Sequence, residues 1–254
     1  MVMIPPPDLP LYLYRYRWFG PDSKNLNREI EALTKPYIYC ADFNRLNDPM
    51  EGYYRPSKML RSKQTYKQIV RAFRDGKSGV GIASLSDTPH NELMWTHYAG
   101  GYSGFCIEFY ARRLSNALSN DVLLVRLGYD DQPPRISGKD ARDVPAAACK
   151  ILSQKKYNWA YEREWRLLAP VDLLEGPRRG QLRIGANDVI RRILVGSNME
   201  DQDKGAILHA FRNKQVDIEE MVIDGYDKIW VPIQGPKYER KRKAENKRRA
   251  RPSR

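Results

Sequence analysis

Short runs rich in apolar and aromatic residues alternate along the chain with segments whose apolar residues recur every three or four positions. The runs predict strands and the periodic segments predict helices. Strands are expected at residues 11–19, 37–40, 80–85, 105–110, 122–129, 159–166, 181–184, 190–195, 221–224 and 229–233. Helices are expected at residues 23–34, 57–75, 92–99, 111–118, 140–157 and 200–213. Because the two kinds interleave without a repeat, they predict an α+β or α/β fold, with one mixed central sheet flanked by helices.

The length of 254 residues fits one large domain. Residues 1–10 are proline-rich and are expected to form a flexible N-terminus, and residues 11–235 are expected to form a single, catalytic-like domain. Ten of the 44 Lys and Arg residues, but only two of the 31 Asp and Glu residues, lie in 237–254. A block of this kind cannot bury an apolar core, so residues 236–254 are predicted to be a basic tail, either disordered or a frayed helix.

The cysteine content points to a reducing compartment. Cys40, Cys106 and Cys149 are far apart and form no CxxC pair, which argues against a disulfide framework and against structural zinc. The N-terminus lacks the apolar core of a signal peptide, and no apolar run is long enough to span a membrane. We therefore expect a cytoplasmic protein that has no membrane partner.

The most unusual segment is W-A-Y-E-R-E-W-R, at residues 159–166. On an extended strand, Glu162 and Glu164 point to the same face, where their repulsion raises the pKa of one of them unless a cation intervenes. A raised carboxyl pKa suits general acid/base chemistry near neutral pH. The pattern also fits a half-exposed strand whose glutamates pair with arginines. Under the first alternative we assign Glu164 as catalytic and Glu162 as the anchor of an arginine such as Arg17 or Arg166.

A second cluster lies at residues 43–52, F-N-R-L-N-D-P-M-E-G. Asn47 and Asp48 precede a proline, and this order is typical of a tight turn. Turn chemistry alone does not explain the carboxylates of Asp48 and Glu51, so all three polar residues are candidate binding residues.

Two further groups contain candidate site residues. The predicted helix at 92–99 carries Trp95, His97 and Tyr98, and His97 is either a hydrogen-bonded structural residue or a catalytic one. Tyr16 and Arg17 lie near the end of the first predicted strand, and Arg17 is a candidate anion binder.

With these segments, the chain resembles a bacterial family known as domain-of-unknown-function family 2971. The family motifs are a Tyr-Arg strand, F-N-D-P-x-E, M-W-x-H-Y-A with G-x-C-I-x-F, and W-x-Y-E-x-E-W-R. Residues 16–17, 43–51, 94–109 and 159–166 match them, except that Leu46 stands where the family has phenylalanine. The resemblance covers about residues 11–196. It implies no defined activity, although members look like effector or defence genes, which implies a toxin-like enzyme.

Three functions remain open. The first is an enzyme acting on a nucleotide-containing substrate, in particular an ADP-ribosyltransferase-like transferase that uses NAD. In that case Arg17 grips a phosphate, Tyr16, Trp95 or Tyr98 stacks an aromatic ring, and Glu164 stabilises developing positive charge. The second is a Mg²⁺-dependent nuclease that uses the carboxylates of Asp48, Glu51, Glu162 and Glu164. The third is a non-catalytic nucleic-acid-binding protein, which the basic tail and the cationic segment 57–75 favour.

Overall fold

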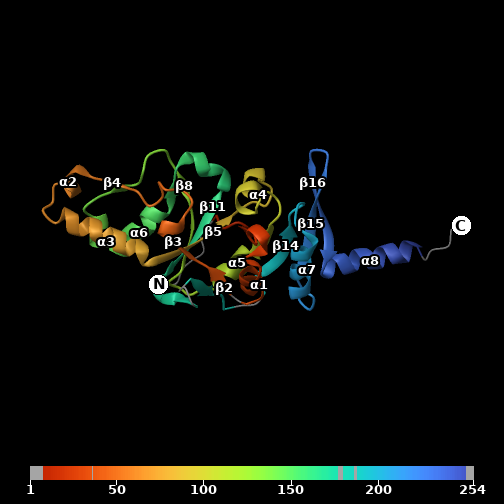
Figure 1. Cartoon of the computed structure of the whole chain (residues 1–254). Coiled ribbons are helices and arrows are strands. Elements are labelled where there is room, and N and C mark those ends of the chain that lie inside the picture. The colour runs from red at the N-terminus through yellow and green to blue at the C-terminus, as the bar shows by residue number, and fades with distance from the viewer. Residues whose placement is uncertain (1–7, 36, 177–179, 186–187, 250–254) are drawn as a thin grey trace. The chain divides into compact units, whose positions relative to one another are not determined.

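The computed structural model describes residues 8–35, 37–176, 180–185 and 188–249, and the chain divides into two compact units. The first unit comprises Met1–Leu9, Tyr37–Asp87 and Ser115–Gly185. The second unit comprises Pro10–Pro36, Thr88–Leu114 and Ala186–Arg254. Each unit combines strands and helices, as Figure 1 shows.

The first unit is built around an antiparallel sheet in which β11 (Glu164–Pro170) lies between β5 (Val80–Ser86) and β7 (Leu123–Arg126). Trp165 is paired with Leu85 on one side and with Arg126 on the other. The short strand β3 (Ala41–Asp42) pairs with β5. Strand β11 has a neighbour on both edges, and its residues from Glu164 to Ala169 are all buried, including two charged ones.

Shorter strands complete the first unit. β2 (Tyr37–Tyr39), β13 (Gln181–Arg183) and β12 (Leu174–Glu175) form an antiparallel sheet. β4 (Arg55–Pro56) pairs in parallel with β9 (Arg135–Ile136), and β8 (Gly128–Tyr129) pairs in parallel with β10 (Gln154–Lys155). Its 3₁₀ turns are η2 (Phe43–Arg45), η3 (Asp140–Arg142), η4 (Tyr157–Glu162) and η5 (Val171–Leu173).

The helices of the first unit are α2 (Lys58–Arg61), α3 (Tyr66–Ser78) and α6 (Val144–Leu152). Helices α3 and α6 pack against each other around a core of Leu60, Phe73, Ile136, Ala147 and Ile151. Gly76 allows this close approach, because a Cβ atom there would lie 2.8 Å from Cγ1 of Val144. A glycine inside a helix weakens the helix itself, so packing explains its presence.

The second unit contains a mixed sheet in the order β16-β15-β14-β6-β1. Its strands are β1 (Tyr12–Arg17), β6 (Phe105–Tyr110), β14 (Ile190–Val195), β15 (Asp217–Asp224) and β16 (Asp227–Gln234). Only the β14–β15 pair is parallel among these neighbours. The accompanying helices and turn are η1 (Pro21–Ser23), α1 (Leu26–Thr34), α4 (Glu92–Tyr98), α5 (Ala111–Asn116), α7 (Asp201–Ala210) and α8 (Pro236–Arg249).

Two buried glutamates of the second unit, Glu108 and Glu219, share Arg192 as an ion-pair partner. Glu108 is inaccessible to solvent, and Nε of Arg192 lies 2.6 Å from its Oε2 atom. NH1 of Arg192 also contacts Oε2 of Glu219 at 2.7 Å. Arg192, on β14, thus links the strands on its two sides, β6 and β15, through their carboxylates.

The described part of the basic tail is the helix α8, which leads away from the base of the β15–β16 hairpin in Figure 1. Its first turn is attached to β15, because Nζ of Lys237 contacts Oε1 of Glu219 at 2.7 Å and its backbone N–H donates to Asp217. Of the two states expected for the tail, this part is helical. No helix among the described residues is long and apolar enough to cross a membrane.

The predicted α+β class with a mixed sheet is confirmed, but several predicted elements are wrong in their bounds. The helix expected at 57–75 is divided into α2 and α3, which are separated by residues 62–65. The strand expected at 159–166 starts only at Glu164, because residues 157–162 form η4 and Arg163 adopts a left-handed backbone with φ 47°. The helix expected at 140–157 is limited to α6, whose N-terminus is capped by the Asp143 side chain. The helix expected from residue 23 starts at Leu26. The predicted boundaries at 10 and 235 stay a prediction, and residues 1–7 lie outside the described residues.

We predict that Phe73→Ala destabilises the protein by about 3–5 kcal/mol, because it removes a fully buried ring from the α3–α6 core. Met59→Ala, at a side chain that is 77% exposed on α2, should leave the stability unchanged. Urea unfolding followed by circular dichroism measures both. Equal midpoints for the two variants would contradict this description of the core.

Candidate functional site

Four of the predicted site residues meet in the first unit as a cluster of buried charges. Glu51, Glu162, Glu164 and Arg166 lie together with Lys155, and we call these five residues the buried charge network. Each of their side chains is at most 5% exposed.

Arg166 and Lys155 link the three carboxylates. Nε of Arg166 lies 2.7 Å from Oε1 of Glu164, and its NH2 group lies 2.5 Å from Oε2 of Glu51. Nζ of Lys155 lies 2.6 Å from Oε2 of Glu162, 3.0 Å from Oε1 of Glu51 and 3.5 Å from Oε2 of Glu164. Every carboxylate therefore contacts at least one cation, as buried charges require.

Local structure places the five side chains. Glu164 and Arg166 are two residues apart on β11 and so point to the same face of the sheet. Glu162 ends η4, and its backbone carbonyl accepts a hydrogen bond of 2.7 Å from the Ser86 hydroxyl. The left-handed Arg163 separates η4 from β11, so Glu162 does not reach the network by strand alternation.

Glu51 arrives through the predicted turn. Oδ1 of Asp48 accepts a hydrogen bond of 2.8 Å from the backbone N–H of Met50, and the N–H of Glu51 donates to the Asp48 carbonyl at 3.1 Å. Asp48 is buried, and its Oδ2 atom has no hydrogen-bond partner among the described residues. Asn47 lies on the surface of the same turn. Asp48 thus holds the turn that brings Glu51 to the cations.

The neighbouring cations favour the ionised form of Glu164. Burial works to raise the pKa of Glu164, but the neighbouring Arg166 and Lys155 outweigh it, so the pKa is lowered from its ordinary value of 4.5. Burial likewise works to lower the pKa of Lys155, but Glu164, Glu51 and Glu162 raise it above the ordinary 10.5. The repulsion expected between Glu162 and Glu164 is therefore relieved by cations, and Glu164 is not held protonated for acid/base work.

Sequence reasoning missed Lys155, which lies inside the helix expected at 140–157. A site that buries several carboxylates needs more than one cation to compensate their negative charge. Lys155 lies only seven residues before Glu162, and this spacing was the available signal.

The other predicted residues lie in the second unit. Trp95 is fully buried, its ring centroid lies 5.3 Å from that of Tyr16, and its Nε1–H donates to the Pro89 carbonyl at 2.8 Å. The Tyr16 hydroxyl donates to the Thr88 carbonyl at 2.8 Å. Burial raises the pKa of Tyr16 above its ordinary value. These two rings form part of the core of this unit.

Arg17 also has a partner within the second unit. Its Nε atom lies 2.7 Å from Oε2 of Glu29 on α1, and its NH2 group contacts the other carboxylate oxygen. His97 is exposed, and its ring centroid lies 6.3 Å from that of Tyr98. The Arg17–Glu29 pair fixes α1 to the end of β1.

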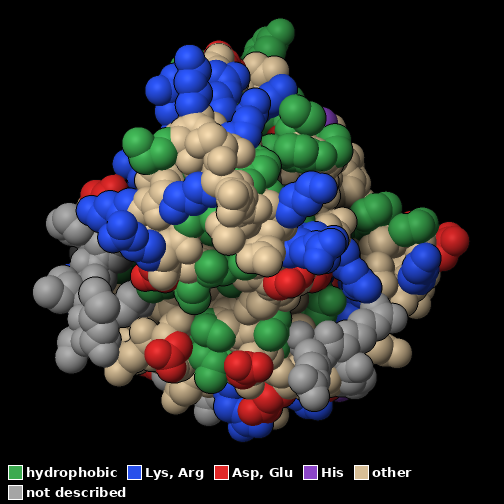
Figure 2. All heavy atoms as spheres, turned by 90° about the vertical axis from the view of Figure 1, so that its left-hand side faces the viewer, with side chains coloured by type: hydrophobic (Ala, Val, Ile, Leu, Met, Phe, Trp, Pro, Cys, Tyr) green, Lys and Arg blue, Asp and Glu red, His purple; other side chains and the backbone are tan. Residues whose placement is uncertain are grey.

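A different kind of candidate site lies on the surface of the first unit. Residues 55–77 contain eight Lys and Arg residues and one acid, Asp75. Seven of the eight are exposed: Arg55, Lys58, Arg61, Lys63, Lys67, Arg71 and Arg74. We call these seven side chains the α3 basic face. Figure 2, which looks at the side where α2 and α3 lie, shows blue Lys and Arg side chains with hydrophobic ones between them.

Most of the α3 basic face is electrostatically uncompensated. Within the described residues, Arg74 pairs with Asp75 at 3.5 Å, and the other six cations have no ion-pair partner. Apolar side chains are exposed in the same part of the chain, with Tyr53 62% exposed and Met59 77% exposed. Exposed cations beside exposed rings match the side chains that bind phosphates and stack on bases.

In the described part of the chain, no group of three His, Cys, Asp or Glu side chains is placed to hold a metal ion. The positions between the carboxylates of the buried charge network are taken by Lys155 and Arg166.

We predict that Glu164→Gln lowers the stability at pH 7 by about 3–5 kcal/mol, because Arg166 and Lys155 would each lose one of their buried carboxylate partners. Since the pKa of Glu164 is lowered in the folded state, its contribution is present above pH 4.5 and is lost as the pH falls further. The variant should therefore lose less stability than the wild type between pH 7 and pH 3.

Glu175→Gln is the matched control, because Glu175 pairs with Arg183 on the exposed surface. Its melting temperature should equal that of the wild type. Thermal unfolding at several pH values measures all three proteins, and parallel pH profiles for Glu164→Gln and the wild type would contradict the assignment.

Comparison with known proteins finds one matching family model, and that family has no described activity. Neither a curated protein nor a solved structure matches the chain. Residues 94–167, which carry four of the five residues of the buried charge network, match the model of a family described as "Protein of unknown function (DUF2971)". Over these residues, which are less than half of the chain, the match supports the family that the sequence motifs indicated.

Proposed function

We propose that the chain binds RNA or DNA through the α3 basic face. The observation that carries this proposal is the set of six exposed cations that lack an ion-pair partner within the described residues. Such cations repel one another, and the phosphates of a nucleic acid relieve this repulsion while releasing bound counterions. A surface evolved only for solubility has both signs of charge interspersed.

The exposed apolar side chains support a nucleic acid over a simple anion. Tyr53 and Met59 offer an exposed ring and an exposed, flexible thioether in the same part of the chain as the basic side chains. A nucleic-acid strand presents bases as well as phosphates, and base stacking on aromatic side chains tolerates any sequence.

The helix α8 is a second basic element, in the second unit. Its sequence, PKYERKRKAENKRR, is charged around the helix and leaves no apolar face for packing. It therefore supports a role in attracting polyanions by charge alone, as an addition to the α3 basic face.

The transferase hypothesis stays a prediction that the geometry does not favour. The Glu164 side chain is 3% exposed and both of its oxygens contact cations. A substrate would reach it only after the buried charge network opens. The Trp95 ring is likewise buried, so it stacks on no incoming ring in this conformation. A Mg²⁺-dependent nuclease requires Lys155 and Arg166 to leave the same carboxylates.

We predict that the triple variant Lys63→Glu, Lys67→Glu, Arg71→Glu binds a single-stranded RNA at least about tenfold more weakly at low salt, because phosphate contacts are lost. The slope of log K against log[salt] should fall by about 0.7 for each contact removed on a single strand. Fluorescence anisotropy over a salt series measures both quantities.

The control for this variant carries the same change in net charge elsewhere. Lys24→Glu, Arg112→Glu, Lys156→Glu alters three exposed cations that lie outside the α3 basic face and have no ion-pair partner among the described residues. Equal losses of affinity in the two triple variants would show that net charge alone drives binding, which contradicts the proposal.

We predict that removing residues 240–254 leaves the melting temperature nearly unchanged, because the cut preserves the contacts of Lys237 with β15. At low salt, the truncated protein should bind RNA or DNA more weakly than the wild type. This difference in affinity should shrink as the salt concentration rises. A large drop in melting temperature would show instead that the distal part of α8 supports the fold.

A further inference from the structure

A pocket of about 380 Å³ lies at the C-terminal end of α3. Helix α3 ends at Ser78, and Val80, the first residue of β5, lines the pocket. Lys77, in the last turn of the helix, lies 4.6 Å above the ring of Phe43, the first residue of η2. Lys77 follows Arg74, the last residue of the α3 basic face, by about one helical turn, and η2 supplies Asn44 and Arg45 to the pocket. The pocket therefore lies at the end of α3 where the α3 basic face stops.

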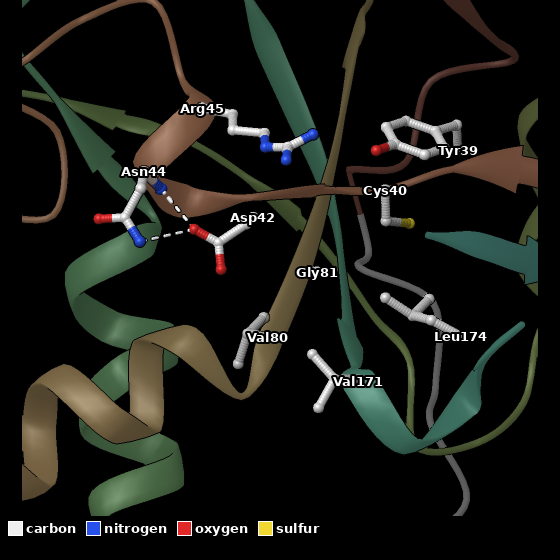
Figure 3. A pocket seen from close by; sticks show the side chains of 9 residues that line it. All are labelled: Tyr39, Cys40, Asp42, Asn44, Arg45, Val80, Gly81, Val171 and Leu174. Carbon is white, nitrogen blue, oxygen red and sulfur yellow. Dashed lines mark hydrogen bonds between the residues drawn. The ribbon is translucent and has the colours of Figure 1, made fainter. Parts of the chain in front are cut away.

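The pocket combines an apolar floor with an aromatic wall. Val80, Gly81, Val171 and Leu174 form the apolar part, and the Tyr39 ring lies on the opposite side in Figure 3. A Cβ atom on Gly81 would lie 2.5 Å from Cδ1 of Leu174, so the bare glycine keeps the floor closely packed. A volume of this size is at the lower end of those that hold small ligands.

Two charged side chains, Asp42 and Arg45, line the pocket. Arg45 is exposed, has no ion pair or hydrogen bond among the described residues, and points across the pocket toward Tyr39 in Figure 3. The Asp42 carboxylate uses only Oδ1 internally, where it accepts hydrogen bonds from the backbone N–H of Asn44 at 2.8 Å and from Nδ2 of Asn44 at 2.7 Å. Oδ2 remains available to accept a hydrogen bond from a ligand.

A planar ring that carries an amino group matches this arrangement. One of its faces can stack on Tyr39 or on the guanidinium of Arg45, and its amino group can donate to Oδ2 of Asp42. Unpaired nucleobases are the units of a nucleic acid that have this chemistry. Guanine, cytosine and adenine carry amino groups, whereas uracil flanks its one N–H with two carbonyl oxygens that a carboxylate repels.

We infer that this pocket takes one unpaired, amino-bearing nucleobase of a single strand whose backbone lies on the α3 basic face. This inference rests on the proposed function and assigns it a substrate class, single-stranded nucleic acid with a preference against uracil. Phosphates supply most of the affinity, Arg45 stacks on the base, and Asp42 selects it.

Asp42→Asn tests the base selection. The amide oxygen of the new side chain still accepts from the backbone of Asn44, so the turn is preserved, while its NH₂ group now donates to a uracil carbonyl. The wild type should bind a 12-nucleotide oligo-C about tenfold more tightly than the matching oligo-U, and the variant should lose this difference. Fluorescence anisotropy on the full chain measures both affinities.

Val171→Phe tests the cavity itself, because a larger side chain on η5 fills it. This variant should lower the affinity for oligo-C to that for oligo-U, and leave the affinity for a 12-base-pair duplex unchanged, because paired bases cannot enter the pocket. Arg45→Gln should weaken binding to both single strands. Thermal melts identify any variant that fails to fold, and in that case the oligo-C to oligo-U ratio of the other pocket variant decides.

The outcomes separate this inference from the proposed function. If the wild type binds all three nucleic acids and neither Asp42→Asn nor Val171→Phe changes the oligo-C to oligo-U ratio, the pocket inference is overturned while the proposed function stands. If the wild type binds none of them, the proposed function fails. Calorimetry with CMP and UMP then decides the pocket: CMP binding that Asp42→Asn abolishes supports it, and no binding overturns it.

Discussion

Burial of five charged side chains around β11 is the constraint on which the first unit depends. Three glutamates and two cations occupy a region that excludes water, and both Arg166 and Lys155 connect the β11 strand to Glu51 on the turn that follows η2. Removing a charge from water is costly, and the cost is offset only when geometry and partners are both correct. The network therefore specifies one arrangement of β11, η4, β10 and the Asp48 turn, rather than merely adding stability.

This constraint explains why the motifs around residues 47–51 and 159–166 look catalytic in sequence. Carboxylates beside tryptophans are typical of acid/base sites, but they are equally typical of a buried ion-pair network. The difference lies in the cations, which lower the pKa of Glu164 although its burial works to raise it. The surface that is free to act lies elsewhere in the same unit, on α2 and α3. Here cations are exposed and lack ion-pair partners among the described residues, in contrast to those of the network.

The sequence predicted the fold class, the positions of most strands and helices, and the tight turn at the Asn-Asp-Pro segment. Periodicity could not predict that Arg163 takes a left-handed backbone, because that conformation is decided by tertiary contacts. It could not place Lys155 against Glu51 either, since the two are far apart along the chain. Trp95 was predicted as a ligand-stacking ring, but helical periodicity does not distinguish a core ring from one that faces a cleft. The pocket beside Arg45 depends on η5 and β12, which come more than 100 residues later in the chain.

Hydrogen–deuterium exchange with and without a 20-nucleotide single-stranded RNA tests most directly the claim that the network is structural and the α3 basic face is functional. The account predicts that RNA slows exchange in residues 40–45 and 57–77, while the amides of β11, already protected by pairing on both edges, do not change. Protection that appears in residues 157–166 but not in residues 57–77 would contradict it, because the RNA would then act at the carboxylate motif.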